Sequence, residues 1–352
     1  MTGSAAGEAI PALDRAGGNS AGGFVLPNPR AALPTRRAPG VRRTCTIDVL
    51  WPAGRMGPLV AEGAGRDIRT PAPGEPPSLL AQDRVRVEIS PERRILGVST
   101  LPERPQLAQL AQLVGTSRPG ELRQLLRDLR AAQVLQASPL YQLLDDIPGV
   151  LVVADWAWSR WPQFLGPDEP RRRIVKLAGL EGVCAGFRAD SSALHTRGDY
   201  QEERVAPVQP LPDADDPCGW HALPEIHDVS LRRARCIDVW FDGRIQIEAF
   251  FQDSATTAAG ARAAVHEYTL RATASAEDER LLEIAAVPHI LPFPECPGAL
   301  DHLQAMVGTP LKDLRESVLQ TLARTKGCTH LNDVIRALAD VPGLRAGLSA
   351  AG

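Results

Sequence analysis

The feature that most constrains the fold of this chain is an internal repeat. The segment Arg-Arg-Thr-Cys-Thr-Ile-Asp-Val at positions 42–49 recurs as Arg-Arg-Ala-Arg-Cys-Ile-Asp-Val at positions 232–239. Further motifs recur in the same order: Leu-Val-Gly-Thr at 113–116 and Met-Val-Gly-Thr at 306–309, Glu-Leu-Arg at 121–123 and Asp-Leu-Arg at 313–315, Asp-Ile-Pro-Gly at 146–149 and Asp-Val-Pro-Gly at 340–343. A shared order at nearly the same spacing indicates a tandem duplication, with one module at about 41–150 and a second at about 230–346.

The second module begins with strands and ends with helices. Its expected strands alternate apolar and polar residues, and Asp242-Gly243 is a hairpin turn signal between the first two. The expected strands are 234–240, 244–253, 265–274 and 281–287. Apolar spacing of three and four residues then predicts helices over 297–306, 311–324 and 329–339.

The first module has the same order, with 84–89 and 95–100 as its second strand pair. Strands followed by helices predict an α+β fold, in which a small antiparallel sheet carries helices packed on one face. The remaining residues are connections. Residues 1–40, rich in Gly, Ala and Pro, are expected to be disordered, and residues 151–229 form a connector whose Trp-rich start is expected to pack on the first module.

The composition excludes several classes of function. The net charge of -3 argues against broad nucleic-acid binding, and no apolar run is long enough to cross a membrane. Residues 1–40 have no pattern typical of a signal peptide, and the six scattered cysteines are expected to be reduced thiols, so we expect a cytoplasmic protein. The preference for arginine over lysine is typical of a GC-rich bacterial genome.

Soft metal ligands gather in the second module only. Cys296 lies at an expected strand-to-helix turn, Cys328 and His330 lie at the start of the last helix, and His266 and Glu267 begin the third strand. Thiolate and imidazole are ligands for Zn²⁺ or iron, and a thiol at a helix N-terminus has a lowered pKa. We therefore predict a metal site of His266, Cys296, Cys328 and His330, with Glu267 and His330 as candidate catalytic groups.

The first module serves as an internal control. When the modules are aligned on Asp-(Ile/Val)-Pro-Gly, Val134 and Gln136 take the places of Cys328 and His330. Gln82 and Asp83 fall opposite His266 and Glu267, and no thiol corresponds to Cys296.

Structural interpretations of the same residues remain open at this point. Cysteine is among the most buried residue types, so Cys296 and Cys328 can be core residues. Thr329 can be a simple N-cap, and His330 can be an exposed helix residue. His289 is a further candidate for the site, whereas Cys45 and Cys236 are assigned to packing, and Cys184 and Cys218 receive no role.

The Arg-Arg-x-x-x-Ile-Asp-Val opening, the His-Glu strand, the Glu-Cys-Pro turn and the Gly-Cys-Thr-His-Leu helix start carry a resemblance. Over about 230–346 the chain resembles a bacterial family of unknown function with a C-terminal Cys-Thr-His-Leu signature. The family implies an organisation and no activity.

A second resemblance is structural, to iron–sulfur scaffold modules of the NifU, IscU and SufE-like type. In those modules a Cys/Asp pair on a strand, a Cys at the turn and an adjacent His-Cys pair opening the last helix supply the ligands. The resemblance implies the same places for His266-Glu267, Cys296 and Cys328/His330. Here His replaces the first thiol and the late pair is Cys-x-His, so mononuclear Zn or Fe fits better than an iron–sulfur cluster.

Three hypotheses of function follow. The first is a metal-binding protein that acts on a small molecule as a metal-assisted enzyme. The second is a metal-free enzyme in which Cys328 works with His330 or His266 as base and Glu267 as orienting group. The two side chains at 328 and 330 point about 200° apart on one helix, so they meet only if Cys328 precedes the helix. The third is a non-catalytic binding or assembly module.

Overall fold

One large antiparallel sheet organises the protein, which is α+β as the pattern of strands and helices predicts. The computed structural model describes residues 28–30, 33–101, 103, 105–116, 119–131, 137–168, 177–195 and 204–349. The nine strands run in the order β4-β3-β2-β1-β6-β7-β8-β5, and β9 also pairs with β8. Their bounds are β1 Gly40–Leu50, β2 Leu59–Thr70, β3 Ser78–Ile89, β4 Ile95–Leu101, β5 Ala206–Pro207, β6 Ser230–Phe241, β7 Ile245–Thr256, β8 Arg262–Ala274 and β9 Leu281–Ile290.

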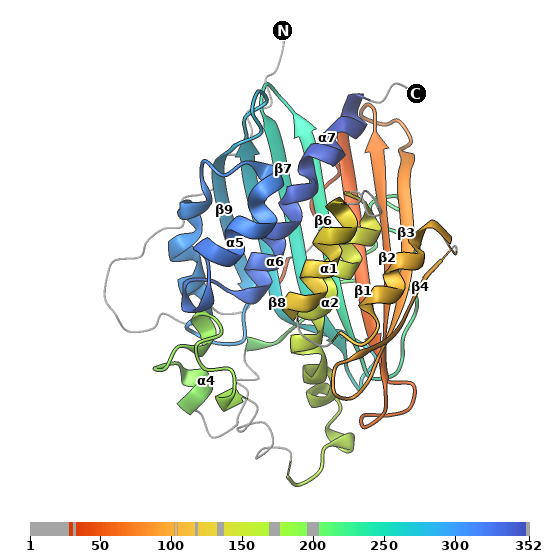
Figure 1. The fold of residues 1–352 in the computed structure, drawn as a ribbon, viewed down its shortest axis with the longest axis vertical. Coiled ribbons are helices and arrows are strands. Elements are labelled where there is room, and N and C mark those ends of the chain that lie inside the picture. Colours follow the sequence, from red (N-terminus) through yellow and green to blue (C-terminus); the bar gives the residue numbers. More distant parts are fainter. Residues whose placement is uncertain are drawn as a thin grey trace.

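The helices of both halves lie on one face of this sheet, as Figure 1 shows. The α-helices are α1 Pro119–Ala131, α2 Pro139–Val153, α4 Ser192–His195, α5 Leu314–Thr321, α6 Thr329–Ala337 and α7 Val341–Ser349. The 3₁₀ helices are η1 Pro105–Leu113, η2 Ala154–Arg160, η3 Pro162–Phe164, η4 Ala185–Phe187, η6 Cys296–Met306, η7 Leu311–Asp313, η8 Arg324–Lys326 and η9 Leu338–Asp340. The helix predicted at 297–306 is therefore a 3₁₀ helix, and the one predicted at 311–324 is α-helical only over α5.

Strands β1 and β6 pair at the centre of the sheet and join the two halves. Their antiparallel register sets Arg42 opposite Asp238 and Asp48 opposite Arg232. Both pairs are buried ion pairs: Arg42 Nη2 lies 2.7 Å from Asp238 Oδ2, and Arg232 Nε lies 2.7 Å from Asp48 Oδ1. The two contacts are reciprocal, so the seam between the halves is locally two-fold symmetric.

A buried network of charges ties the helices to the sheet. Arg235 on β6 pairs with Asp146 on α2, at 2.8 Å, and Arg43 on β1 pairs with Asp340 in η9, also at 2.8 Å. Each half of the sheet thus binds a helical segment of the other half. Removing one member of a buried ion pair leaves an uncompensated charge and typically costs about 3–5 kcal/mol, so these contacts fix the position of the helices.

Chain segments without regular structure cover part of the other sheet face. Leu211 and Trp220 pack on Ala234, Cys236 and Phe250 there. His221 lies between two β1 hydroxyls, 2.9 Å from Thr44 Oγ1 and 2.7 Å from Thr46 Oγ1.

The N-terminal residues predicted to be disordered lie mostly outside the described part of the chain. Within the described part, Arg36 binds Asp216 through Nε and Nη2, and Asn28 donates its backbone N–H to the carbonyl of His289 at 2.8 Å. These contacts attach the described residues before β1 to the sheet.

The first part of the connector, described over 151–168 and 177–195, packs on the helix-bearing side of the sheet. Trp156 and Trp158 in η2 are buried in the same cluster as the core of the first half, and Trp158 packs edge-on against Trp51 at 5.5 Å. The Trp-rich start of the connector therefore packs on the first half, and also on the second, where Trp161 Nε1 donates to the carbonyl of Thr256 at 2.9 Å. The following segment, with η4, lies against the C-terminal half, where Ala185 N–H donates to the carbonyl of Gly327 at 2.9 Å.

Candidate functional site

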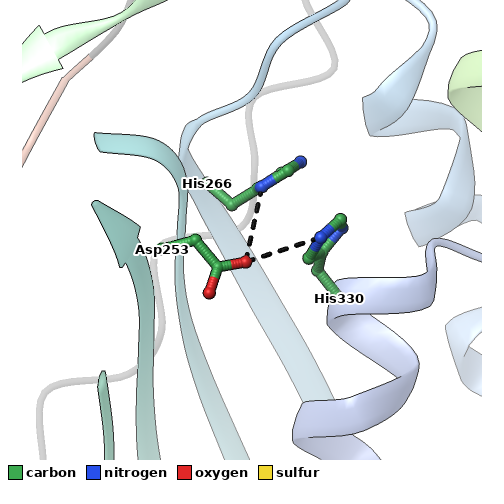
Figure 2. A group of neighbouring side chains, drawn as sticks. All are labelled: Asp253, His266 and His330. Atoms are coloured by element: carbon green, nitrogen blue, oxygen red, sulfur yellow. Dashed lines mark ion pairs between the residues drawn. The ribbon is translucent and has the colours of Figure 1, made fainter. Parts of the chain in front are cut away.

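Three buried polar side chains converge between the sheet and the helices of the C-terminal half. Asp253 projects from β7, His266 from the neighbouring strand β8, and His330 from the first turn of α6 (Figure 2). Asp253 Oδ2 lies 3.6 Å from His266 Nδ1 and 3.5 Å from His330 Nε2. The two imidazole rings are stacked, with centroids 3.5 Å apart and an interplanar angle of 21°.

Local structure explains this convergence. Asp253 and His266 are cross-strand partners in the β7–β8 register, directly beside a β-bulge, so both side chains point to the same face of the sheet. Cys328 is the N-cap of α6 with extended backbone (φ -116°, ψ 130°), and Thr329 is the first helical residue. His330 therefore faces the sheet, and its predicted alternative as an exposed helix residue is wrong, because it is 8% exposed.

Burial and one arginine set the protonation of these groups. Burial lowers the pKa of His266 and lowers the pKa of His330 well below its ordinary value, so both rings are neutral at pH 7. Burial alone would raise the pKa of Asp253, but the guanidinium of Arg233 holds this pKa well below its usual range. Arg233 binds both carboxylate oxygens, each at 2.9 Å.

The separations of the donor atoms are close to those that a small divalent cation requires. His266 Nδ1 and His330 Nε2 are buried without a hydrogen-bond partner, and both face Asp253 Oδ2. Two ligand atoms of a tetrahedral Zn²⁺ with bonds of roughly 2.1 Å lie about 3.4 Å apart, close to the separations observed here. Among the described residues, Asp253, His266 and His330 are the one group of at least three His, Cys, Asp or Glu residues whose possible ligand atoms all lie within 4.8 Å of one another.

Cys328 contacts the other edge of the His330 ring. Its Sγ lies 3.8 Å from His330 Nδ1 and 3.5 Å from the hydroxyl of Tyr268, which donates to it. Because Cys328 precedes the helix, the two side chains do meet. Burial raises the pKa of the Cys328 thiol, although Tyr268 favours the thiolate, so the expected lowering of this pKa by the helix N-terminus is overcome.

Cys296 is not among the residues whose donor atoms lie within 4.8 Å of one another, although it lines the same cavity and interacts electrostatically with Cys328. It begins η6 and packs against the backbone of Gly186, where an added Cβ would lie 2.6 Å from Cys296 Sγ and 3.9 Å from Cys184 Sγ. Burial raises the pKa of Cys296 well above its ordinary value. Of the four predicted metal ligands, the structure brings His266 and His330 together and sets Cys328 beside His330. It places Cys296 on the wall of the same cavity, outside the group of close donor atoms.

Glu267 points to the opposite face of the sheet from His266, as successive strand residues do. Its carboxylate accepts hydrogen bonds from the backbone N–H of Arg30 at 2.7 Å and from Gln252 at 2.8 Å. His289 is bound on that face as well, 3.0 Å from Thr269 Oγ1. Neither residue lies beside His330, so the predicted catalytic role of Glu267 has no support in this geometry.

The converging residues open onto an apolar cavity of about 190 Å³. His266, Cys328, Thr329 and His330 line part of its wall. The connector supplies much of the rest, which includes Trp156, Leu165, Leu177, Leu180, Val183, Cys184 and Phe187. The connector, to which the sequence pattern assigns no function, therefore forms much of the cavity wall.

Sequence reasoning missed Asp253 and Cys184. A signal for Asp253 was present, since an aspartate follows the repeated Arg-Arg opening at a similar distance in both halves, as Asp67 and Asp253. The strand register also sets Ala81 opposite Asp67, so Ala81 takes the place of His266. The other counterparts, Val134 and Gln136, lie outside the described residues.

The comparisons with known proteins identify part of the chain. Residues 231–343 match the model of a protein family of unknown function, DUF2889. This match covers the C-terminal half, where the chain resembles a family of unknown function by its sequence motifs. Neither the comparison with curated proteins nor the comparison with solved structures found a match. In the part of the chain that the structure describes, no helix combines the length and apolarity needed to cross a bilayer.

Proposed function

We propose that the protein binds one divalent transition-metal ion, Zn²⁺ or Fe²⁺, through Asp253, His266 and His330, and uses it on a small molecule. The observation that carries the proposal is the pair of buried, unpartnered ring nitrogens that face one carboxylate oxygen at 3.5–3.6 Å. Two histidines and one carboxylate are a ligand set found for catalytic zinc and for non-haem iron.

The hydrogen bonds of His330 support a cation at this point. Its Nδ1 has Cys328 Sγ and Thr329 Oγ1 as partners, so a proton on Nδ1 leaves the lone pair of Nε2 directed at Asp253. A lone pair facing a carboxylate is repulsive unless a cation lies between them. Cys328 would then act as a positioning residue, which fixes the tautomer and orientation of a metal-bound imidazole.

The stacked rings set one structural requirement. Metal ions bind imidazole nitrogens in the plane of the ring, and an ion in the plane of one ring lies out of the plane of the ring stacked 3.5 Å away. Binding is therefore expected to turn one of the two rings. The cavity beside His266 and His330 provides space for this movement. A bound ion with an open position would polarise a carbonyl group or acidify a water molecule.

Metal analysis tests the proposal. Protein purified without a metal-affinity tag and dialysed against Zn²⁺ or Fe²⁺ is expected to hold about one equivalent by mass spectrometry. His330→Ala should abolish this binding, whereas the matched change His302→Ala, on the exposed side of η6, should leave it unchanged. Wild-type protein that takes up neither ion would refute the proposal.

Cysteine variants separate the ligands from their neighbours. Cys328→Ser is expected to weaken metal binding by about 10–100-fold, as is typical of residues that support a ligand. Cys296→Ser should leave metal content unchanged, because Cys296 does not belong to the group of donor atoms within 4.8 Å of one another. Equal loss of metal in both variants would favour the thiol-rich site predicted from the sequence.

A metal-free nucleophile is the second candidate. Cys328, His330 and Asp253 follow one another at 3.8 and 3.5 Å, which is the order of a Cys-His-Asp triad. Burial favours the neutral thiol and the neutral imidazole, which argues against an activated thiolate in the resting protein. Rapid alkylation of Cys328 by iodoacetamide at pH 7 in metal-free protein would favour this candidate.

We also propose that the halves at 41–150 and 230–346 are copies of one module. The reciprocal ion pairs across β1 and β6 support this, as do register shifts at Asp67/Ile68 and at Asp253/Ser254. The likeness to NifU- and SufE-like modules, and the cytoplasmic and bacterial assignments, remain predictions.

A further inference from the structure

We infer that the cavity binds a small, largely apolar molecule with one terminal carbonyl or carboxylate oxygen, which it directs at Asp253, His266 and His330. This inference rests on the proposed metal site and adds the class of ligand. Its basis is the composition of the cavity wall, its size, and the charge at its polar end.

The wall is built mainly from apolar side chains of three separate segments. Val153, Trp156 and Leu177 come from the connector, Val265 from β8, and Phe293 from the segment that follows β9. Val153, Trp156, Val265 and Phe293 are buried, with exposures of 2–8%. An apolar ligand body that replaces water against such a wall gains binding free energy in proportion to the area buried.

The size of the cavity suits a single ring or a short alkyl chain. Its volume is about 190 Å³. An apolar cavity of roughly 150 Å³ lined by Leu, Ile and Phe is sufficient to bind benzene. A larger cofactor, such as a dinucleotide, does not fit.

The charges of the described part of the wall do not favour a highly charged ligand. Besides the histidines, the charged residues in the described lining are Arg55 and Asp155, which have opposite signs. A ligand with several charges would lose its hydration without gaining matching partners. Phosphorylated metabolites are therefore disfavoured.

The polar end favours one oxygen donor. Arg233 already balances the charge of Asp253 through two hydrogen bonds, and an imidazole that binds a metal ion is neutral. A divalent ion bound there leaves the site positive in a buried setting. A carbonyl or carboxylate oxygen compensates this charge, whereas a purely apolar molecule does not.

A pair of hydroxamates tests the inference on zinc-loaded protein by calorimetry. Benzohydroxamate and acetohydroxamate share a head with a carbonyl oxygen that binds zinc, and they differ in the apolar body. We expect benzohydroxamate to bind at least about tenfold more tightly, because only its ring reaches the apolar wall. His330→Ala should weaken benzohydroxamate binding at least about tenfold, because the head loses its anchor.

Two tryptophan substitutions localise the effect. Leu177→Trp fills the cavity from its half-buried connector wall and should remove the preference for benzohydroxamate, with zinc content and acetohydroxamate affinity retained. Leu319→Trp, on α5 outside the cavity lining, is the matched control and should keep the preference.

Each contrary result has a distinct meaning. Zinc-loaded protein that binds both hydroxamates equally would overturn the apolar ligand class and leave the metal site intact. Benzohydroxamate binding that His330→Ala does not affect would overturn the placement of the oxygen at the metal. Protein that takes up no zinc would overturn the proposed function, and with it this inference.

Discussion

The two halves of the sheet carry the same arginine–aspartate pair in different surroundings. Arg43 binds Asp67 in the N-terminal half as Arg233 binds Asp253 in the C-terminal half, with Nε–Oδ1 distances of 2.7 and 2.9 Å. Across the strand pairing, however, Asp67 faces Ala81, whereas Asp253 faces His266. The arginine–aspartate pair is therefore common to the architecture of both halves, whereas only the C-terminal half sets a histidine beside it.

The halves also differ on the opposite face of the sheet. In the N-terminal half, Thr44 and Thr46 hold the ring of His221. The equivalent positions on β6 are Ala234 and Cys236, which pack in an apolar cluster with Trp220. At each of these two places, one half therefore has buried polar groups where the other half has apolar residues.

The largest expected effect comes from breaking the shared ion pair in each half. Asp67→Asn and Asp253→Asn each remove one of the two carboxylates that bind a buried arginine, since Arg43 also binds Asp340 and Arg233 also binds Asp333. Each should therefore lower the free energy of unfolding of the metal-free protein, by up to about 3–5 kcal/mol. Urea denaturation followed by circular dichroism measures this loss. Only Asp253→Asn should also abolish metal binding, because only Asp253 faces two imidazoles.

Two results would contradict this expected difference between the halves. Loss of metal in Asp67→Asn would mean that metal binding depends on general stability. Retention of metal in Asp253→Asn would remove the carboxylate from the ligand set.

The second test concerns the glycine that ends the repeated Asp-(Ile/Val)-Pro-Gly motif. A Cβ at Gly149 in α2 would lie 2.2 Å from Asp333 Oδ2 and 2.4 Å from Arg233 Nη1, both in the buried charge network. A Cβ at Gly343 in α7 would meet only Ala137, at 3.2 Å. We expect Gly149→Ala to cost about 2–3 kcal/mol and Gly343→Ala to change stability by less than about 1 kcal/mol, as measured by thermal unfolding. Equal costs would show that the two motifs are equally crowded.

Much of the fold follows from the sequence because its patterns are local. Alternation and the Asp242-Gly243 turn predict the β6–β7 hairpin, and Gly243 has the positive φ of 94° that such a turn requires. The pairing of β1 with β6 is not local, since strand patterns do not specify which edges meet. The reciprocal Arg and Asp positions on β1 and β6 indicate this pairing only once the antiparallel register is known.

The sequence predicts only part of the candidate site, because only part of it depends on local patterns. His266 and His330 follow from residue type and position at element starts, and they do converge. Asp253 depends on the register beside a β-bulge, which no local pattern reveals. Glu267 shows the reverse case, because the alternation of strand residues already places it on the face away from His266.

The last test uses pH to separate the two halves on the opposite sheet face. Burial lowers the pKa of His221 to about 3, against an ordinary value of 6.5. Below pH 6.5 the unfolded chain therefore binds a proton that the folded chain excludes, so the stabilising effect of neutral His221 is complete above pH 6.5 and declines as pH falls. The decline amounts to about 2 kcal/mol between roughly pH 7.5 and pH 5, at 1.36 kcal/mol per pKa unit. His221→Gln keeps a polar group between Thr44 and Thr46 but does not titrate, so the decline of its unfolding free energy should be smaller by this amount. The decline that remains comes from other groups, among them His266, His330 and His289, whose pKa values burial also lowers. His227→Gln, at a residue whose side chain is 76% exposed, should keep the slope of the wild-type protein. If His221→Gln retained the full slope, the acid sensitivity would lie in these other groups, and His221 would not distinguish the two halves.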